Sequence, residues 1–292
     1  MPISYRPYQN PSDLAIQKQL WLQATQHLPW AWKPNKTQIW YTQQANFDPK
    51  SKLFAFDGSA PIGYTSCIQR DTFTPLGFPW VLDGYEGEIQ DFLFTTIYDY
   101  AVKQFHSKSF LQRFRKEWDY HIKFFEKYGF ELAWSNPIYI RELKKTPLDI
   151  DFAAYTAKIH QTMPVNALFA IIQNDPALQD EDKNSLKEYF AVDLDLDWVL
   201  EVQDSHSTPI GMSAITSRED SGYAELSLLT ANQMIPHALN LTLELTINEL
   251  ISRDRKFLSV TVKEDSPKID FFESYEFKLR SESVFYSKEI KK

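Results

Sequence analysis

The sequence contains one nine-residue stretch twice. FFEKYGFEL occupies residues 124–132 and FFESYEFKL occupies residues 271–279, and six of the nine positions are identical. The two copies start 147 residues apart in a chain of 292 residues. Solenoid repeats recur roughly every 20 to 50 residues, which is far shorter than this interval. The interval has the length of a whole domain, so the repeat predicts a duplicated domain.

A second pair of similar stretches supports the duplication. APIGYTSCI begins at Ala60 and TPIGMSAI begins at Thr208, which places Gly63 and Gly211 148 residues apart. Both landmarks therefore recur in the same order and at nearly the same interval. The joint is expected in the polar segment 144–151, where Pro147 resists regular structure. We predict an N-terminal domain at residues 1–146 and a C-terminal domain at residues 149–292.

The composition excludes several classes of protein. Hydrophobic residues make up 43% of the chain, which is typical of globular proteins, and each half can form its own core. The sequence has no apolar run long enough for a membrane helix and no signal-peptide pattern at its start. A single cysteine, Cys67, excludes an internal disulfide framework, and a net charge of −8 disfavours nucleic acid. We expect a cytoplasmic protein without nucleic-acid or membrane partners.

Local patterns predict an α/β order in the first half. Strands are expected at residues 3–9, 52–58, 61–71, 77–84, 109–115 and 136–143, and helices at 11–27, 35–47, 88–104 and 120–130. The second half is expected to open with two helices and then to follow a similar order. Helices are expected at residues 151–163, 181–190, 236–254 and 267–277, and strands at 197–204, 208–217, 222–231, 256–262 and 279–290. Segment 236–254 also alternates like a strand, but its length favours a helix.

This order of elements, ending in a helix with FFEKYGF or FFESYEF, resembles the GNAT acyltransferase superfamily, in its tandem arrangement. The family's final helix carries a stretch similar to LYEKLGF. The resemblance covers nearly the whole chain, twice. It implies two tandem GNAT-like domains, each with a mixed, mostly antiparallel sheet flanked by helices. It also implies acetyl-CoA as the co-substrate, whose pyrophosphate the family holds at the N-terminus of the long helix.

The two halves differ at this helix N-terminus. Free backbone N–H groups and the helix dipole attract anions there. In the first half the corresponding residues 83–91 include Glu86, Glu88 and Asp91, which would repel a diphosphate. The N-terminal domain is therefore expected to be degenerate, and its acidic residues to act as helix caps.

The second half has no acidic residue in the corresponding turn before Glu244. The resemblance places His237 where the family has Arg or Gln, and Ala238 and Asn240 where it has glycines. The expected cofactor-binding residues are Leu228, Leu229, Thr230, His237, Ala238 and Asn240. His237 is equally compatible with an exposed polar residue in a first helical turn. The missing glycines leave binding of acetyl-CoA open.

The resemblance also suggests residues for the chemistry. Acetyl transfer to an amine needs a base, and Glu225 matches the position of the family's glutamate on the fourth strand. Glu225 also fits the solvent face of an alternating strand. The family's tyrosine acid is replaced by Phe125 and Phe272, which cannot donate a proton, so Tyr286 on the closing strand is the substitute candidate.

Two classes of function stay open. The first is an acetyl-CoA-dependent N-acetyltransferase that acts on a small-molecule or peptide amine. The second is a catalytically inactive binding or scaffold protein that kept the fold. No metal is expected, because the histidines lack metal-ligand spacing. A tryptophan-rich stretch at residues 21–40 suits either an aromatic wall of an acceptor site or packing between the halves.

Overall fold

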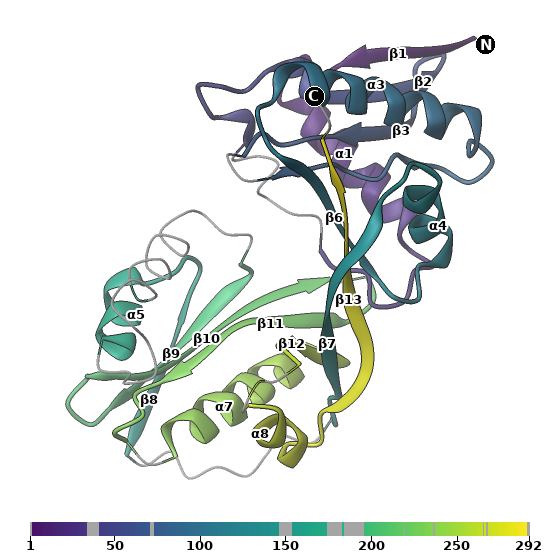
Figure 1. The fold of residues 1–292 in the computed structure, drawn as a ribbon. Coiled ribbons are helices and arrows are strands. Elements are labelled where there is room, and N and C mark those ends of the chain that lie inside the picture. The colour runs from purple at the N-terminus through teal and green to yellow at the C-terminus, as the bar shows by residue number, and fades with distance from the viewer. Residues whose placement is uncertain are drawn as a thin grey trace. The chain divides into compact units, whose positions relative to one another are not determined.

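The protein packs as two compact units, termed unit 1 and unit 2. The computed structural model describes residues 2–33, 41–70, 73–145, 154–173, 183, 196–218, 220–235, 237–264, 266 and 268–290. Unit 1 contains the described residues up to Pro137 and those from Ser281 onward, whereas unit 2 contains the described residues from Ile138 to Arg280. Each unit is an α/β structure (Figure 1).

Unit 1 begins with a strand and a helix, and its four-stranded sheet is antiparallel. Its elements in chain order are β1 (Ile3–Pro7), α1 (Ser12–Ala24), the 3-10 turn η1 (Pro49–Ser51), β2 (Lys52–Asp57), β3 (Ala60–Ser66), β4 (Thr74–Pro75), β5 (Trp80–Val81), α3 (Glu88–Gln104), β6 (Ser109–Arg115), α4 (Asp119–Lys127) and the first part of β7 (Glu131–Glu142). The strands β1, β2, β3 and β5 form one ladder in that order, and β4 pairs with β6 in parallel. Runs of consecutive buried residues along β2 and β3 show that both faces of the sheet are covered.

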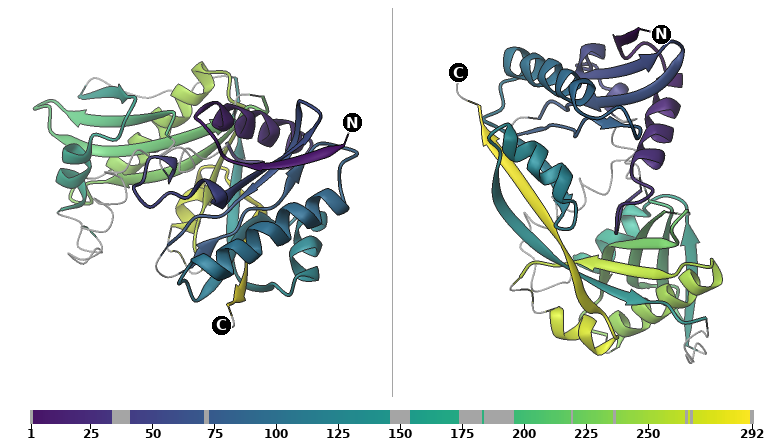
Figure 2. Two further views of the ribbon diagram at one scale, coloured as in Figure 1. Left: turned by 90° about the horizontal axis from the view of Figure 1, so that it is seen from above. Right: turned by 90° about the vertical axis from the view of Figure 1, so that its right-hand side faces the viewer.

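Unit 2 has a larger continuous sheet. Its own elements are β8 (Tyr155–His160), α5 (Val165–Ile172), β9 (Trp198–Asp204), β10 (Pro209–Arg218), β11 (Tyr223–Ala231), α7 (Ala238–Ser252), β12 (Phe257–Thr261), α8 (Ile269–Ser274) and the start of β13 (Lys278–Glu289). The strand order is β8-β9-β10-β11-β12-β7, and only the β11–β12 pair in it is parallel. Helices α7 and α8 cover one face of this sheet and α5 covers the other (Figures 1 and 2), and a separate apolar cluster lies on each face.

The last strand of each sequence half ends in the unit built mainly by the other half. Residues 138–142 of β7 pair with β12 in unit 2, and residues 283–289 of β13 pair with β6 in unit 1. Figure 1 shows the yellow end of β13 beside β6. The packing units therefore do not coincide with residues 1–146 and 149–292, and that division stays a prediction about the duplicated segments.

Most expected elements are present, but the start of the second half is not as expected. Residues 155–160 form strand β8, where a helix was expected at 151–163, and residues 151–153 lie outside the described residues. Helix α5 follows at residues 165–172, which the sequence patterns did not indicate. Residues 35–40 of the helix expected at 35–47, and all of that expected at 181–190 except Lys183, lie outside the described residues. With β8 in place, the second half opens with a strand and a helix, as the first half does.

The two repeated motifs occupy corresponding elements. The FFE stretches lie on α4 and α8, and each helix ends in a residue with left-handed backbone, Gly129 (φ 76°) or Glu276 (φ 64°). The amide of the next residue, Phe130 or Phe277, then donates to a carbonyl five residues back. This is the hydrogen-bond pattern of a left-handed C-terminal cap, so both copies end their helices in the same way.

The glycines of the other repeated motif lie on β3 and β10 and permit close packing. A Cβ on Gly63 would lie 2.6 Å from Val81 Cγ1 and 2.9 Å from the Trp80 carbonyl oxygen. A Cβ on Gly211 would lie 1.9 Å from Thr242 Oγ1, on the first turns of α7. The same motif therefore admits a neighbouring strand in unit 1 and the helix α7 in unit 2.

Candidate functional site

The centre of unit 2 is strand β11, which carries an irregularity near its middle. Its ladder with β10 pairs Leu226 with Ile215 and Leu228 with Ala214, which leaves Ser227 as an extra residue. Such a β-bulge turns the backbone locally and frees one peptide group from the ladder. Ser227 is exposed, so this peptide group lies at an accessible point of the strand.

On its other side, β11 separates from its neighbour. Its parallel ladder with β12 comprises only Tyr223, Ala224 and Glu225, the last of which pairs with Ser259. Strand β11 continues to Ala231, still paired with β10. Within the described residues, the β12-facing backbone edge of residues 226–231 therefore has no strand partner and can accept an extended ligand through its peptide groups.

Glu225 lies where the two strands separate. Its neighbours Ala224 and Leu226 face the core beneath α7, so alternation directs Glu225 to the opposite face of the sheet, which also carries Leu228 and Thr230. Glu225 is half-buried. The predicted base is thus at the point of strand separation, with its carboxylate on the α5 face.

Strand β11 leads through a turn to the N-terminus of α7. His237 precedes the helix with left-handed backbone (φ 64°) and an exposed side chain, and Ala238 is 3% exposed. Leu229 is buried, whereas Leu228, Thr230 and Asn240 are half-buried. The first turn of α7 contains no acidic residue. The structure therefore brings these predicted residues together at the end of one strand and the start of one helix.

A tyrosine links this helix to α8. The Tyr275 hydroxyl donates to Glu244 Oε1 over 2.9 Å and also interacts with the side chain of Asn240. Burial, together with the adjoining Glu244 carboxylate, raises the pKa of Tyr275 to about 12. The phenol therefore keeps its proton at neutral pH and holds the first turns of α7. Phe272, at the family's acid position, is 2% exposed and belongs to the core.

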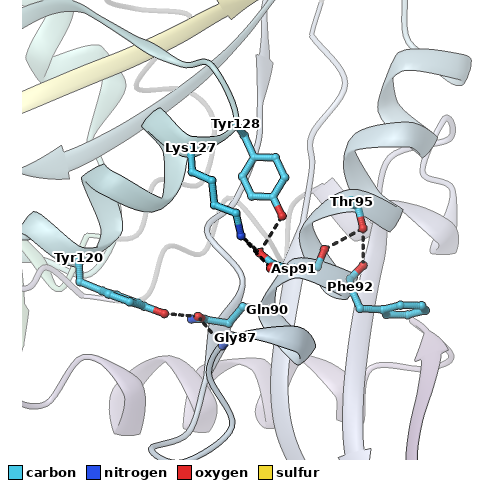
Figure 3. A network of polar contacts seen from close by, with 8 residues as sticks. All are labelled: Gly87, Gln90, Asp91, Phe92, Thr95, Tyr120, Lys127 and Tyr128. Atoms are coloured by element: carbon cyan, nitrogen blue, oxygen red, sulfur yellow. Dashed lines mark hydrogen bonds and ion pairs between the residues drawn. The ribbon is translucent and has the colours of Figure 1, made fainter.

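The corresponding turn of unit 1 is filled by the chain's own polar groups (Figure 3). Gln90 Oε1 accepts hydrogen bonds from the Gly87 amide and from the Tyr120 hydroxyl. Just before α3, the Glu86 carboxylate accepts the amide of Gly84 over 2.9 Å. Two backbone donors near the start of α3, the amides of Gly84 and Gly87, are thus engaged by side chains.

Asp91 completes this network. Its carboxylate accepts bonds from Lys127 Nζ at 2.7 Å and 2.8 Å, and from the Tyr128 hydroxyl at 2.7 Å (Figure 3). Burial alone would raise the pKa of Asp91, but the bonds from Lys127 and Tyr128 hold it below its ordinary value. Asp91 is therefore a negative charge at the first turn of α3, and an incoming diphosphate would be repelled by it.

Tyr286, the other residue considered for catalysis, lies in unit 1. Its ring is 8% exposed and packs in the unit 1 core, and its hydroxyl donates to Glu126 Oε1 over 3.3 Å. Burial and the nearby Glu126 raise the pKa of Tyr286. The structure places Tyr286 and Glu225 in different units, and a shared role for them stays a prediction.

The tryptophan-rich stretch also packs within unit 1. Trp21 lies 4.7 Å from Trp80, and Trp32 stacks on Trp118 at 4.8 Å between ring centroids. Trp40 lies outside the described residues. Trp21 and Trp32 therefore pack in the core of unit 1, and the expected acceptor wall or packing between the halves stays a prediction.

Comparison with known proteins identifies the architecture. No family model and no curated protein matches the sequence. Among solved structures, a tandem GNAT protein from the clavulanic acid biosynthesis pathway matches with a TM-score of 0.67 and 12% identity, over 100% of this chain and 99% of that chain. The chain has a tandem GNAT fold.

Two further structures match this tandem GNAT fold. A GCN5-related N-acetyltransferase from Sphaerobacter thermophilus has a TM-score of 0.56 and 12% identity, over 99% of this chain and 96% of that chain. A GCN5-related N-acetyltransferase from Anabaena variabilis has a TM-score of 0.51 and 10% identity, over 99% of this chain and 73% of that chain. No helix among the described residues of the tandem GNAT chain has both the length and the apolar character to cross a membrane.

Proposed function

We propose that the protein is an acetyl-CoA-dependent N-acetyltransferase and that unit 2 performs the transfer to a small-molecule or peptide amine. The observation that supports this most is the geometry of β11. It separates from β12 at Glu225 and leads to a helix whose first turn carries no acid. The titles of the structural neighbours, which name GNAT proteins and N-acetyltransferases, support the same class.

The residues of unit 2 fit a diphosphate and an extended thioester arm. Ala238 is small, and backbone N–H groups of the first turn of α7 point out of the helix end. His237 is exposed beside them, and its imidazole can donate a hydrogen bond to a phosphate oxygen. Leu228, Leu229 and Thr230 would hold the arm through the backbone edge of β11. Unit 1 fits less well, because Glu86 and Gln90 accept the amides of Gly84 and Gly87, and Asp91 adds a negative charge to the first turn of α3.

Acetyl-CoA would supply the activated acetyl group. In the proposed mechanism, Glu225 accepts the proton that the acceptor amine loses as it attacks. The peptide group freed at Ser227 would then stabilise the negative charge that develops on the carbonyl oxygen of the acetyl group. A protein acid is not required for departure of the thiol, because thiols ionise near pH 8.5, approximately. Phe272 in place of the family's tyrosine is therefore compatible with transfer.

The second candidate is a binding or scaffold protein without catalysis. The observation in its favour is the combination of Phe272 at the acid position with the absence of glycine from the first turn of α7. Such a protein would bind acetyl-CoA or a partner but would not catalyse acetyl transfer.

Calorimetric titration with acetyl-CoA tests the proposal first. Unit 2 should bind it, and His237→Asp, which adds a carboxylate to the first turn of α7, should weaken binding about tenfold. Ser252→Asp at the other end of the same helix is the matched control and should change affinity little. Absence of binding to the unmodified protein would contradict the proposed function.

Turnover separates the two candidates. With an acceptor found in an amine panel, Glu225→Gln should lower kcat/KM by about 10²–10⁴ while affinity for acetyl-CoA is retained. Equal turnover with and without the carboxylate would remove Glu225 from the mechanism. Binding of acetyl-CoA without turnover of any amine would favour the non-catalytic protein.

A further inference from the structure

The ring of His121, in the first turn of α4, is enclosed by aromatic side chains of unit 1. The chain has six histidines, all among the described residues, and His121 is the one that is buried, with 8% exposure. Its neighbours come from β5 and the segment before it, from β6, and from the start of α4. The ring centroid of His121 lies 4.4–6.4 Å from the centroids of Phe78, Trp80, Phe114, Trp118 and Tyr120.

The imidazole has no hydrogen-bond partner for one of its nitrogens in this enclosure. Nδ1 of His121 is buried and has no partner among the described residues. Buried polar atoms are nearly always hydrogen-bonded in proteins, because an unpaired one costs free energy. Protonation would add a positive charge to the same enclosure, so the cost of burying the ring would rise.

The charged groups of the surrounding elements are directed elsewhere. Arg115 of β6 donates to the chain after α1 and to β13, and the segment around β5, residues 76–82, contains no titratable residue. The Tyr120 hydroxyl donates to a side chain of α3 (Figure 3). The charged residues of the β6–α4 turn and of the start of α4 are exposed: Lys116, Glu117, Asp119 and Lys123. Burial, rather than a neighbouring charge, lowers the pKa of His121 to about 4.

His121 lies between two strands of unit 1 that share no pairing. Strand β5 ends the four-stranded sheet, whereas β6 belongs to the second sheet. Phe78 and Trp80 approach the imidazole from the β5 side, and Phe114 approaches it from β6. The aromatic contacts around His121 therefore join two strands that no backbone ladder connects within the described residues.

Unit 2 has no equivalent of this histidine. The repeated motif aligns His121 with Lys268, which is exposed just before α8. The histidines of unit 2 are half-buried or exposed: His160, His206 and His237. A proton at the position of His121 would therefore act on unit 1 and leave unit 2 as it is.

We propose that His121 makes unit 1 acid-sensitive, because its protonation separates the aromatic side chains that join β5 to β6 and opens unit 1 while unit 2 stays folded. This inference does not depend on the proposed function. The ring faces of Phe78 and Trp80 attract a cation, but this attraction is weaker than the cost of burying an ion without hydrogen bonds.

The direction of the effect follows from where the proton binds more tightly. Histidine in an unfolded chain ionises near pH 6.5, approximately, so the open state of unit 1 binds the proton more tightly than the native state. The stability of unit 1 is therefore complete above that pH and is lost progressively as the pH falls towards the native pKa of His121.

Hydrogen–deuterium exchange of the β6 and α4 amides measures this opening. After correction for the intrinsic exchange rate, the opening constant of the unmodified protein should rise about 20-fold from roughly pH 7 to pH 5. His121→Phe keeps an aromatic ring and cannot be protonated, so its opening constant should change by less than about threefold over the same range. The amides of α7 and α8 should exchange alike in the two proteins.

Two choices keep the test specific to His121. Burial also lowers the pKa of Lys52 in unit 1 to about 7, so measurements below that pH separate the two residues. His27→Phe makes the same substitution at an exposed position of unit 1 and should open as the unmodified protein does. If His121→Phe does not fold, as judged by circular dichroism, His121→Leu carries the test, because it is also apolar and uncharged at every pH.

Three results would overturn the inference. The first is an acid-induced opening that persists when His121 is replaced by Phe or Leu. The second is an opening constant of the unmodified protein that stays constant or falls in acid, and a fall would show that the aromatic rings stabilise the imidazolium. The third is an equal rise of exchange in α7 and α8, which would show that the two units open together.

Discussion

The N-termini of α3 and α7 occupy corresponding positions in the two units but differ in charge. In unit 1, Glu86 accepts a backbone amide before α3, and Asp91 accepts bonds from two side chains of α4. In unit 2, the corresponding turn has no acid, and its nearest side chains are Ala238 and Asn240. A helix N-terminus is stabilised by negative charge in either case. Unit 1 supplies that charge itself, and in unit 2 the proposed function assigns it to the diphosphate of acetyl-CoA.

The tyrosines of the repeated motif make the same kind of contact in both units. Tyr128 donates to Asp91 on α3, and Tyr275 donates to Glu244 on α7. Both therefore attach the short last helix to the long helix through a carboxylate. In unit 1 this carboxylate lies in the first turn, whereas in unit 2 it lies in the second turn. The carboxylate that each tyrosine contacts therefore lies about one turn further from the helix N-terminus in unit 2 than in unit 1.

The largest expected effect concerns the phenylalanines at the family's acid position. Phe125 and Phe272 are 0% and 2% exposed in the cores of the two units. Phe125→Ala and Phe272→Ala should each lower the free energy of unfolding by about 3–5 kcal/mol, because each leaves a cavity. Urea denaturation monitored by circular dichroism measures both. A loss of turnover in Phe272→Ala without any loss of stability would contradict a packing role.

Next in size is the effect of adding a methyl group to the motif glycines. Gly63→Ala meets the Trp80 carbonyl, which cannot move away, and should destabilise unit 1 by about 2–3 kcal/mol. Gly211→Ala meets first the Thr242 hydroxyl and should cost about 1–2 kcal/mol.

A second substitution distinguishes the two glycines. Thr242→Ala should recover much of the stability lost in Gly211→Ala, because it removes the side chain that the new methyl group meets. Val81→Ala should recover little in Gly63→Ala, because the Trp80 carbonyl stays in place. Equal recovery in both units would show that the two glycines face the same kind of neighbour.

The sequence predicted the architecture through features that depend on local physics. The motif repeat placed α4 and α8, and the length of segment 236–254 decided between helix and strand for α7. Strand β8 was missed because it is an edge strand with mostly exposed side chains, so it lacks the alternating buried pattern. The exchanged ends of β7 and β13 could not be foreseen, because a strand pattern does not specify which strand it pairs with.

The candidate site was predictable in its residues and not in its contacts. The charges of Glu86, Glu88 and Asp91 are visible in the sequence, but Lys127, which pairs with Asp91, is 36 residues away. The 2.8 Å contact between His160 Nε2 and Glu201 Oε2 in unit 2 was not predicted either, because the two residues are 41 positions apart and His160 fell in a segment expected to be helical. Correct assignment of β8 and β9 as neighbours would have been needed first.

A smaller effect is expected at high pH, on the free energy of unfolding that the Tyr275–Glu244 and Tyr128–Asp91 contacts contribute. Burial raises the pKa of Tyr275 to about 12, and burial and Asp91 also raise that of Tyr128. The native state therefore holds these protons more tightly than the unfolded chain, in which tyrosine ionises near pH 10, approximately. The stabilisation is fully present below that pH and is lost as pH rises towards the native pKa.

Tyrosine-to-phenylalanine variants test this in each unit. Tyr275→Phe and Tyr128→Phe should each cost about 1 kcal/mol at pH 8 through the lost hydrogen bond. Between roughly pH 10 and pH 11, the difference in the free energy of unfolding between each variant and the unmodified protein should shrink. The reason is that the phenol of the unmodified protein begins to ionise on unfolding. Urea denaturation along a pH series measures this. A difference that grows with pH would mean that the native pKa is lowered rather than raised.

The smallest effect concerns the last residue of the repeated helix cap. Gly129 and Glu276 hold the same left-handed backbone, with φ of 76° and 64°. A side chain in this conformation costs about 1 kcal/mol relative to glycine. Glu276 Oε2 lies 3.1 Å from Lys144 Nζ and 3.8 Å from Nη2 of the buried Arg141. These ion pairs offset part of the backbone cost.

Comparing Glu276→Gly with Glu276→Ala isolates the backbone, because both remove the carboxylate and its ion pairs. Glu276→Gly should be more stable than Glu276→Ala by about 1 kcal/mol, and Gly129→Ala should be less stable than the unmodified protein by a similar amount. Thermal unfolding of the three variants gives both differences. If Glu276→Gly and Glu276→Ala are equally stable while Gly129→Ala loses stability, the two caps are not equivalent, and the backbone of unit 2 tolerates a side chain there without strain.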